Sequence, residues 1–333
     1  MERLRLAIQL RGLRVPRRSG IITILSPRLS TIPSRRCLST RSHRQQVNNK
    51  PTVFKPTSHQ RAKMTTNQSP SADILREAFN PAVFDKIRTL WFQNITDPTQ
   101  LILPTPELAK QWFTSDANFD KLCVETFTPQ LQTIITQTAT INNLTGSSLI
   151  DALSPLTPLD YLSLLLLLDQ VPRNCFRGSE AKKVFTIFDP IAIEVALRAI
   201  SDKIPDAPEI KYRAAYRLWF YLPLQHSEDR KVHELSMTEH RRMFADMREL
   251  VDGPEPEPGT QGAELIRECR EFLSGHRAEV DKWEGMMVSF AERHKVLIDR
   301  FGRYPHRNEA MGREATEEEA RYLAEGGETF SSG

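Results

Sequence analysis

From about residue 70 onwards, hydrophobic residues recur with the period of an α-helix. The spacing i, i+1, i+4, i+7, i+8 places a set of side chains on one helix face, and it is occupied by Val83, Phe84, Ile87, Leu90 and Trp91. The segment 158–169 is apolar on all sides, which is typical of a helix in the centre of a core. The best strand candidate is 184–188, where a helix is still favoured. The pattern therefore predicts an all-α fold.

Several helix starts are marked by a capping residue that is followed directly by proline. The cap side chain can accept a hydrogen bond from a backbone N–H of the first turn, and proline has no N–H to leave unpaired at the first helical position. These starts are Asn80-Pro81, Thr105-Pro106, Thr157-Pro158 and Asp189-Pro190. A further start is predicted at Thr316, which forms a capping-box pattern with Glu319. Each start predicts a separate helix.

The second half of the chain contains two long, charged and amphipathic segments, 227–251 and 263–301. Ser227 is suited to cap the first of them. The residues between them are rich in proline, glycine and glutamate, which interrupt a helix. We therefore expect two long antiparallel helices joined by a flexible acidic loop at 252–262.

The beginning of the chain differs in charge from the rest. Up to residue 63 there are 15 Lys and Arg and one acidic residue, a net charge of +14, so the +3 of the whole chain leaves −11 for residues 64–333. Residues 1–42 combine Arg, Ser, Leu and Ile with almost no acid, as mitochondrial targeting peptides do. Arg36-Cys37-Leu38-Ser39 resembles a processing site. A basic arm that binds nucleic acid or anionic lipid is the less favoured alternative, because leucine and isoleucine are interleaved with the arginines.

Residues 43–69 carry few large apolar side chains and are predicted to be a disordered linker. An all-helical domain is then expected at 70–333, in the mitochondrial matrix. A chain that starts at Met64 would keep this domain without the targeting peptide, and we expect such a form in the cytosol. The longest apolar run, 161–168, is far shorter than the roughly 20 residues that span a bilayer, so no membrane insertion is expected.

Motifs for nucleotide binding and for serine hydrolases are absent from the sequence. His226, His233 and His240 recur every seven residues, but two helical turns are about 10.5 Å long, too far apart for the ligands of one metal ion. We expect solvated histidines on a charged helix and predict no metal site. Cys175 lies between two arginines, which favour a thiolate, although a structural role as a buried free thiol is preferred.

Three polar segments do not suit a core and are too specific in residue type for plain surface. They are 168–178, 221–229 and 300–308. Each lies at the end or beginning of a predicted helix. Their arginines stand out in a domain of net negative charge, because a guanidinium group binds carboxylate or phosphate through a planar pair of donors.

Together with Gly312-Arg313-Glu314 and Thr329-Phe330, these segments in this order resemble domain of unknown function family 924, whose members are related to tetratricopeptide-like helical folds. The resemblance covers roughly residues 71–330. It implies a helical bundle or a short tetratricopeptide-like superhelix, preceded by the disordered leader, and it implies no activity. A 34-residue repeat cannot be traced along the chain.

If the three segments converge, they form a cationic pocket for a small anionic ligand that carries a phosphate or a carboxylate. His226 and His306 are the candidate acid–base residues, since imidazole titrates near neutral pH. The sequence leaves the cofactor unknown, and no nucleic-acid partner is expected. The ligand-binding candidates are Asp169, Arg173, Asn174, Arg177, Glu228, Arg303, Arg307 and Asn308.

The same residues also have a structural interpretation, as helix caps and as buried ion pairs. On that interpretation the protein is a helical adaptor that binds a peptide or a protein partner. Whether the protein is an enzyme stays open. The two hypotheses differ in one respect, because a ligand site requires that the three segments line one open cavity.

Overall fold

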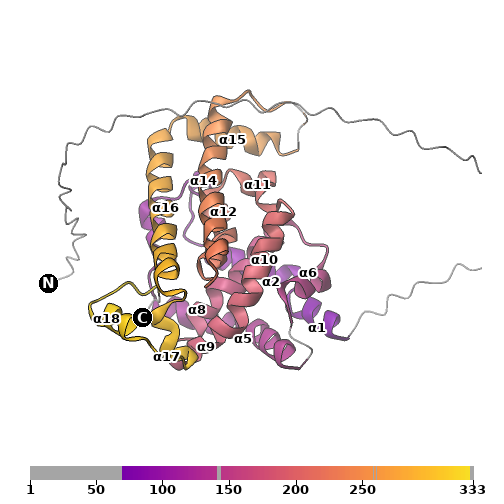
Figure 1. The fold of residues 1–333 in the computed structure, drawn as a ribbon. Helices are drawn as coiled ribbons and strands as arrows, with labels where there is room; N and C mark the ends of the chain where they lie inside the picture. The colour runs from indigo at the N-terminus through magenta and orange to yellow at the C-terminus, as the bar shows by residue number, and fades with distance from the viewer. Residues whose placement is uncertain (1–69, 141–143, 258, 260, 331–333) are drawn as a thin grey trace, which may run out of the picture. The chain divides into compact units, whose positions relative to one another are not determined.

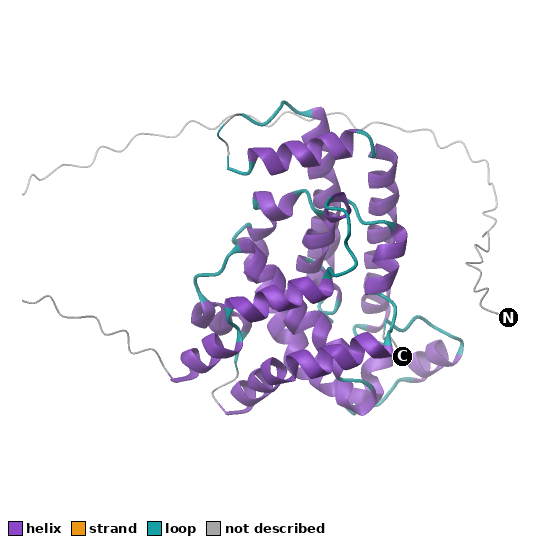
Figure 2. Cartoon of the chain, turned by 180° about the vertical axis from the view of Figure 1, so that it is seen from behind, coloured by secondary structure: helices purple, strands orange, loops and turns teal. Residues whose placement is uncertain are grey.

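The computed structural model describes residues 70–140, 144–257, 259 and 261–330, and helices account for all the regular structure in these ranges (Figures 1 and 2). The all-α prediction is confirmed. In the described ranges, no helix combines the length and the apolar composition that crossing a bilayer requires. The predicted targeting peptide, its processing site, the linker and Met64 lie outside the described residues.

The first half of the domain contains α1 (Pro70–Ala78), α2 (Pro81–Trp91), α3 (Thr99–Ile102), α4 (Pro106–Trp112), α5 (Ala117–Thr140), α6 (Gly146–Leu153), α7 (Pro158–Leu165), α8 (Val171–Cys175) and α9 (Ala181–Lys183). The second half contains α10 (Asp189–Ser201), α11 (Pro208–Lys211), α12 (Ala214–Arg217), α13 (Leu222–Gln225), α14 (Arg230–Asp252), α15 (Ala263–Ser274), α16 (Arg277–Phe301), α17 (Asn308–Met311) and α18 (Glu317–Ala324). Single π-helical turns form at Leu166–Gln170 and Val184–Phe188, and single 3₁₀ turns at Gly178–Glu180, Ile204–Asp206, Leu218–Phe220 and Pro305–Arg307.

The predicted helix caps are mostly confirmed. The side chains of Asn80, Thr105, Thr157 and Thr316 each accept a backbone N–H at the start of α2, α4, α7 and α18. Thr316 and Glu319 form the full capping box, in which each side chain accepts the backbone N–H of the other residue. These starts are local, because the cap and its donor lie three residues apart.

The predicted cap at Asp189 is wrong. The preceding turn, Val184–Phe188, is already helical and leads directly into α10, with Phe188 in the right-handed helical region. The side chain of Asp189 is 2% exposed and accepts a hydrogen bond from Arg173 at 2.6 Å. Asp189 therefore forms a buried ion pair with Arg173 of α8 and does not cap its own helix.

The apolar segment 158–169 lies at the centre of the domain, as predicted. Every residue from Tyr161 to Asp169 is buried, and the leucines of α7 and the following π-helical turn belong to one core that extends from α1 to α16. The segment 184–188 forms a π-helical turn, which confirms the preference for helix over strand there. The central segment therefore delivers Asp169 and α8 from inside the core.

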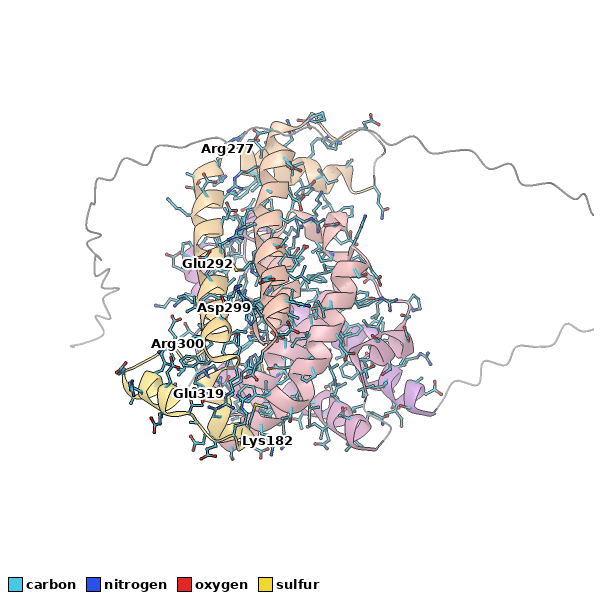
Figure 3. The ribbon with its side chains drawn as sticks, in the orientation of Figure 1. Lys182, Arg277, Glu292, Asp299, Arg300 and Glu319 are labelled. Carbon is cyan, nitrogen blue, oxygen red and sulfur yellow. The ribbon has the colours of Figure 1, made fainter. Side chains whose placement is uncertain are left out.

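Helices α14 and α16 form the expected antiparallel pair (Figures 1 and 3). Ion pairs along their length connect them, and residue numbers rise along one helix while they fall along the other. Examples are Arg230–Asp299 at 3.0 Å, Arg241–Glu292 at 3.4 Å and Arg248–Asp281 at 2.9 Å. Figure 3 labels Arg277, Glu292 and Asp299 in order down α16.

Two details of these helices differ from the prediction. The first long helix begins at Arg230, because Asp229 rather than Ser227 accepts the first-turn N–H. The second predicted helix is two helices, α15 and α16, which are separated at Gly275 and His276.

The expectation of solvated histidines is also wrong. His233 and His240 lie on the inner face of α14 and are 1% and 0% exposed. His226 precedes α14 and follows α13. The heptad spacing places His233 and His240 on the face that packs against the core, because that face of α14 also carries Met243, Phe244 and Met247.

Candidate functional site

The three polar segments meet at one cavity with a volume of about 570 Å³. The first segment contributes Arg173 and Arg177, and the second contributes His226. The third segment contributes Tyr304, His306 and Arg307 to the lining. The apolar walls come from Phe176, Ala181, Val184, Phe185, Ala310 and Phe330, and His294 of α16 completes one side. The convergence that a ligand site requires is therefore present.

A carboxylate from α10 joins two arginines of the cavity. Asp189 accepts a hydrogen bond from Arg173 Nη2 at 2.6 Å through Oδ1, and its Oδ2 lies 3.4 Å from Arg307 Nη1. Arg173 Nη2 also lies 3.5 Å from Asp169 Oδ1. Two buried carboxylates thus balance two guanidinium groups, an arrangement that lowers the cost of burying these charges.

Arg307 is held rigidly. Its guanidinium carbon lies 4.6 Å from the centre of the Phe185 ring and 4.5 Å from that of Tyr304. Its Nη1 donates to the backbone oxygen of His226 at 3.0 Å. Burial lowers the pKa of Arg307, which is 6% exposed, but arginine titrates so far above neutral pH that the side chain stays charged.

Both guanidinium groups keep donors that the protein does not use. Within the described part of the chain, neither Nη1 of Arg173 nor Nη2 of Arg307 has a hydrogen-bond partner. The Nε atoms of both residues are fully enclosed and also have no partner, whereas these two terminal nitrogens are not fully enclosed. Each arginine therefore keeps one unpaired and accessible terminal nitrogen, and both residues line the cavity.

Asp169 and His226 form a second feature of the site. His226 Nδ1 lies 2.6 Å from Asp169 Oδ1, so Nδ1 donates and Nε2 carries the lone pair. Burial opposes ionisation of Asp169, but His226 and Arg173 lower its pKa overall. Burial and then Arg173 lower the pKa of His226, so its imidazole is neutral near pH 7. A neutral imidazole that is oriented by a carboxylate can accept a proton at Nε2.

His306 is less suited to acid–base chemistry. Burial and the neighbouring Arg307 lower its pKa to about 3. Its Nδ1 is enclosed without a hydrogen-bond partner among the described residues. Because an efficient general base has a pKa near the working pH, His226 is the better candidate of the two.

The remaining predicted residues are not all at the cavity. Arg177 lines it and binds Asp120 through two contacts of 3.0 and 2.9 Å. Asp169, Glu228 and Asn308 are not lining residues, although Asp169 and Glu228 bind residues that are: Glu228 accepts the backbone N–H of Tyr304 at 3.0 Å.

Two predicted ligand residues point elsewhere. Asn174 lines a different surface hollow, and its Nδ2 lies 3.8 Å from Cys123 Sγ. Arg303 binds both carboxylate oxygens of Glu319 at 2.6 and 2.7 Å and the backbone oxygen of Glu314. Its position fits the structural interpretation, in which it attaches α18 to the end of α16.

The grouping of Asp169, Asp189 and His226 has the composition of a metal site. One ligand atom from each residue lies within 4.8 Å of the others. However, Arg173 Nη2 already contacts both carboxylates. The guanidinium therefore supplies the positive charge that a metal ion would supply, and we assign no metal here.

Cys175 is not a nucleophile in this arrangement. Burial raises its pKa to about 12, and Asp120 acts in the same direction, while Arg177 opposes the shift. A thiol with such a pKa stays protonated at neutral pH. Its position therefore supports the preferred structural role.

Three important residues of the site did not emerge from the sequence as candidates: Asp189, His294 and Phe330. In the sequence, Asp189 before Pro190 resembles a helix cap. The helical stretch 184–188 that precedes it indicates instead that the helix continues through Asp189. His294 stacks on Phe330 with ring centres 3.4 Å apart. From the sequence, Phe330 stands out only as part of the family pattern, because its contacts are with residues remote in sequence.

The chain is similar to a solved structure and to a protein family, both described as of unknown function. A solved structure of a protein of unknown function from Agrobacterium tumefaciens aligns with a TM-score of 0.45 and 24% sequence identity, covering 73% of this chain and 98% of that chain. No curated protein matches the sequence. The family described as "Bacterial protein of unknown function (DUF924)" matches residues 87–327. Since this match spans most of the chain, the protein belongs to the DUF924 family.

Proposed function

We propose that the protein binds a small anionic molecule, bearing a phosphate or a carboxylate, in the cavity formed by the three polar segments. The observation that carries the proposal is the pair of unused terminal nitrogens on Arg173 and Arg307. Charged donors without an acceptor are costly where water is restricted, and an anion would satisfy both. The cavity volume of about 570 Å³ falls in the usual range of small-molecule sites.

The adaptor hypothesis explains less of this geometry. It accounts for Arg303, whose donors are taken up by Glu319 and Glu314. It gives no reason for two adjacent guanidinium groups to be rigidly held with donors unpaired. We therefore favour ligand binding.

Thermal unfolding of the full chain in the presence of phosphate and carboxylate compounds tests the proposal. A ligand at 100 times its Kd adds about 2.7 kcal/mol to the free energy of unfolding. We expect Arg173→Met to lose this shift and Arg198→Met, which removes an exposed arginine of α10, to retain it. If no anion raises the unfolding temperature, or if both variants respond alike, the cavity is not an anion site.

If the ligand is a substrate, His226 is the acid–base residue of the reaction. Asp169 orients its ring, and Nε2 has no partner within the described ranges. We expect His226→Gln to keep anion binding and to lose turnover once a reaction is found. A variant with unchanged turnover would show that His226 only supports the cavity wall.

We further propose that the protein is mitochondrial, on the basis of the basic, acid-poor composition of residues 1–42. Residues 1–63 fused to a fluorescent protein should direct it to mitochondria. Mapping of N-termini by mass spectrometry tests the shorter form. A cytosolic fraction without peptides that begin at Met64 or Thr65 would rule that form out.

A further inference from the structure

The charges around the cavity limit how much negative charge a ligand can carry. Arg173 and Arg307 contribute two positive charges, and Asp169 and Asp189 contribute two negative ones. Arg177 is paired with Asp120. These charges balance one another, and Glu309 adds a further carboxylate to the lining, so no excess positive charge offsets the charge of a ligand. A monoanion is therefore less costly to bind than a dianion, because uncompensated charges in a buried site are costly.

The two unused nitrogens also favour a particular shape of anion. Asp189 shows that one planar carboxylate can contact both guanidinium groups, with one oxygen on each. The faces of Arg307 are covered by Phe185 and Tyr304, so only its edge can donate. A second carboxylate, bound to the unused nitrogens, would repeat the arrangement of Asp189 from the side of the cavity.

The rest of the lining combines aromatic side chains with three histidines, Ser179 and Glu309. Phe176, Phe185 and Phe330 line the cavity, and Phe330 is held in place by its stack on His294. Aromatic side chains bind flat apolar surfaces by offset or edge contacts. The walls therefore suit a ligand with a planar hydrocarbon body rather than a sugar or a polyamine.

We infer that the ligand is a monocarboxylate with a planar, largely apolar body, whose carboxylate bridges Arg173 and Arg307 and whose body lies between Phe176, Phe185 and Phe330. This inference rests on the proposed function, because it names the chemical class of the anion that the cavity takes.

Isothermal titration calorimetry of the full chain at pH 7.5 with five probes separates the effect of the ligand's charge from that of its planar body. 2-Naphthoate has both the single charge and the planar body, 2-naphthamide has the body without the charge, and acetate has the charge without the body. 2-Naphthyl phosphate and inorganic phosphate carry additional charge. We expect 2-naphthoate to bind at least about tenfold more tightly than each of the other four, which is the effect of one charge-assisted hydrogen bond or one aromatic contact.

Variants locate the bound probe. Phe330→Ala should weaken 2-naphthoate about tenfold and leave acetate unchanged. Arg307→Met combined with Asp189→Asn removes one charge of each sign, so the balance of the cluster is kept, and it should abolish 2-naphthoate binding. Arg198→Met, which changes an exposed arginine of α10 outside the cavity, is the control and should bind 2-naphthoate as the unaltered chain does.

The outcomes distinguish this inference from the proposed function. If either phosphate probe binds more tightly than 2-naphthoate and loses affinity in the Arg307→Met and Asp189→Asn double variant, the inference is overturned while anion binding in the cavity stands. If acetate binds as tightly as 2-naphthoate, the cavity does not bind a planar apolar body, and that part of the inference is refuted. If 2-naphthamide equals 2-naphthoate, or if none of the anions binds, the inference and the proposed function fail together.

Discussion

Asp189 determines how the two arginines of the cavity are held. Its carboxylate contacts both Arg173 and Arg307 and is 2% exposed. Asp189→Ala would leave Arg307 as a buried charge with one partner fewer, and breaking a buried pair from one side costs about 3 to 5 kcal/mol. We expect a loss of this size in the free energy of unfolding, measured by urea denaturation of the full chain.

Two further variants show whether this loss comes from the ion pair. Asp202→Ala removes the partner of the exposed Arg198 and should change stability much less. The double variant Asp189→Ala and Arg307→Met should be less destabilised than the sum of its single variants, because the second change removes the unpaired charge. Additive losses would show that Asp189 and Arg307 do not interact.

Individual site residues differ in how far the sequence reveals them. Arg173, Arg177, His226, His306 and Arg307 could be predicted, because charged side chains at the ends of apolar helices are unusual. Asp189 and Phe330 could not, since their roles come from partners 16 or more residues away. The sequence therefore predicts several donors that reach the cavity, together with Arg303 and Asn174, which do not, and it does not predict the acceptors that the donors meet.

At the scale of elements, two glycines in helices should respond oppositely to alanine. A Cβ on Gly146, at the start of α6, would lie 2.5 Å from Glu194 Cβ and 2.7 Å from the backbone oxygen of Ile191 in α10. Gly146→Ala should therefore separate α6 from α10 and destabilise the domain by about 1 to 3 kcal/mol. A Cβ on Gly285, inside α16, meets nothing within 4 Å.

Gly285→Ala is thus the matched control. It should stabilise the domain by up to about 1 kcal/mol, because alanine restricts the unfolded chain and favours the helix. Thermal unfolding of both variants measures the two effects. A destabilised Gly285→Ala variant, or an unchanged Gly146→Ala variant, would contradict the packing of α6 and α16.

The attachment of α18 depends on Glu319. Its carboxylate accepts hydrogen bonds from Nε and Nη2 of Arg303 and from the backbone N–H of Thr316, and the residue is 2% exposed. Arg303 and these hydrogen bonds lower the pKa of Glu319 to about 2. Glu319→Gln should raise hydrogen exchange throughout Glu317–Ala324, whereas Glu318→Gln, at an exposed position of the same turn, should not. Equal exchange in the two variants would contradict this role for Glu319.

Features that depend on neighbouring residues in the sequence were predicted better than features that depend on contacts between helices. The caps at Asn80, Thr105 and Thr157 depend on residues within one turn, so the sequence alone determines them. The pairing of Asp189 with Arg173 and the packing of α14 against α16 are contacts between different helices. Patterns within one helix do not contain these contacts.

At the scale of the whole molecule, the core contains unusually many neutral histidines. Burial lowers the pKa values of His226, His233, His240, His294 and His306. The unfolded chain would protonate each of them at a higher pH than the folded chain does. The domain is therefore expected to take up protons on unfolding below about pH 6.5, and to lose stability as the pH falls.

His240 allows this expectation to be measured at one residue. It is 0% exposed, its Nδ1 donates to the backbone oxygen of Ser236 at 2.8 Å, and burial lowers its pKa from 6.5 to about 4. The unfolded imidazole is protonated below about pH 6.5 and the folded one only near pH 4, so its contribution to stability declines as the pH falls through that window.

Urea denaturation of the full chain and of His240→Gln at pH 7 and pH 5 separates this contribution from the others. Between these pH values, the unaltered chain should lose about 2 kcal/mol more than the variant, since one pKa unit corresponds to about 1.4 kcal/mol. The other four histidines remain in both proteins and cancel in the comparison. Equal losses would mean that His240 takes up its proton at the same pH in the folded and unfolded chains, which would contradict its enclosed position between Ser236 and Gln225.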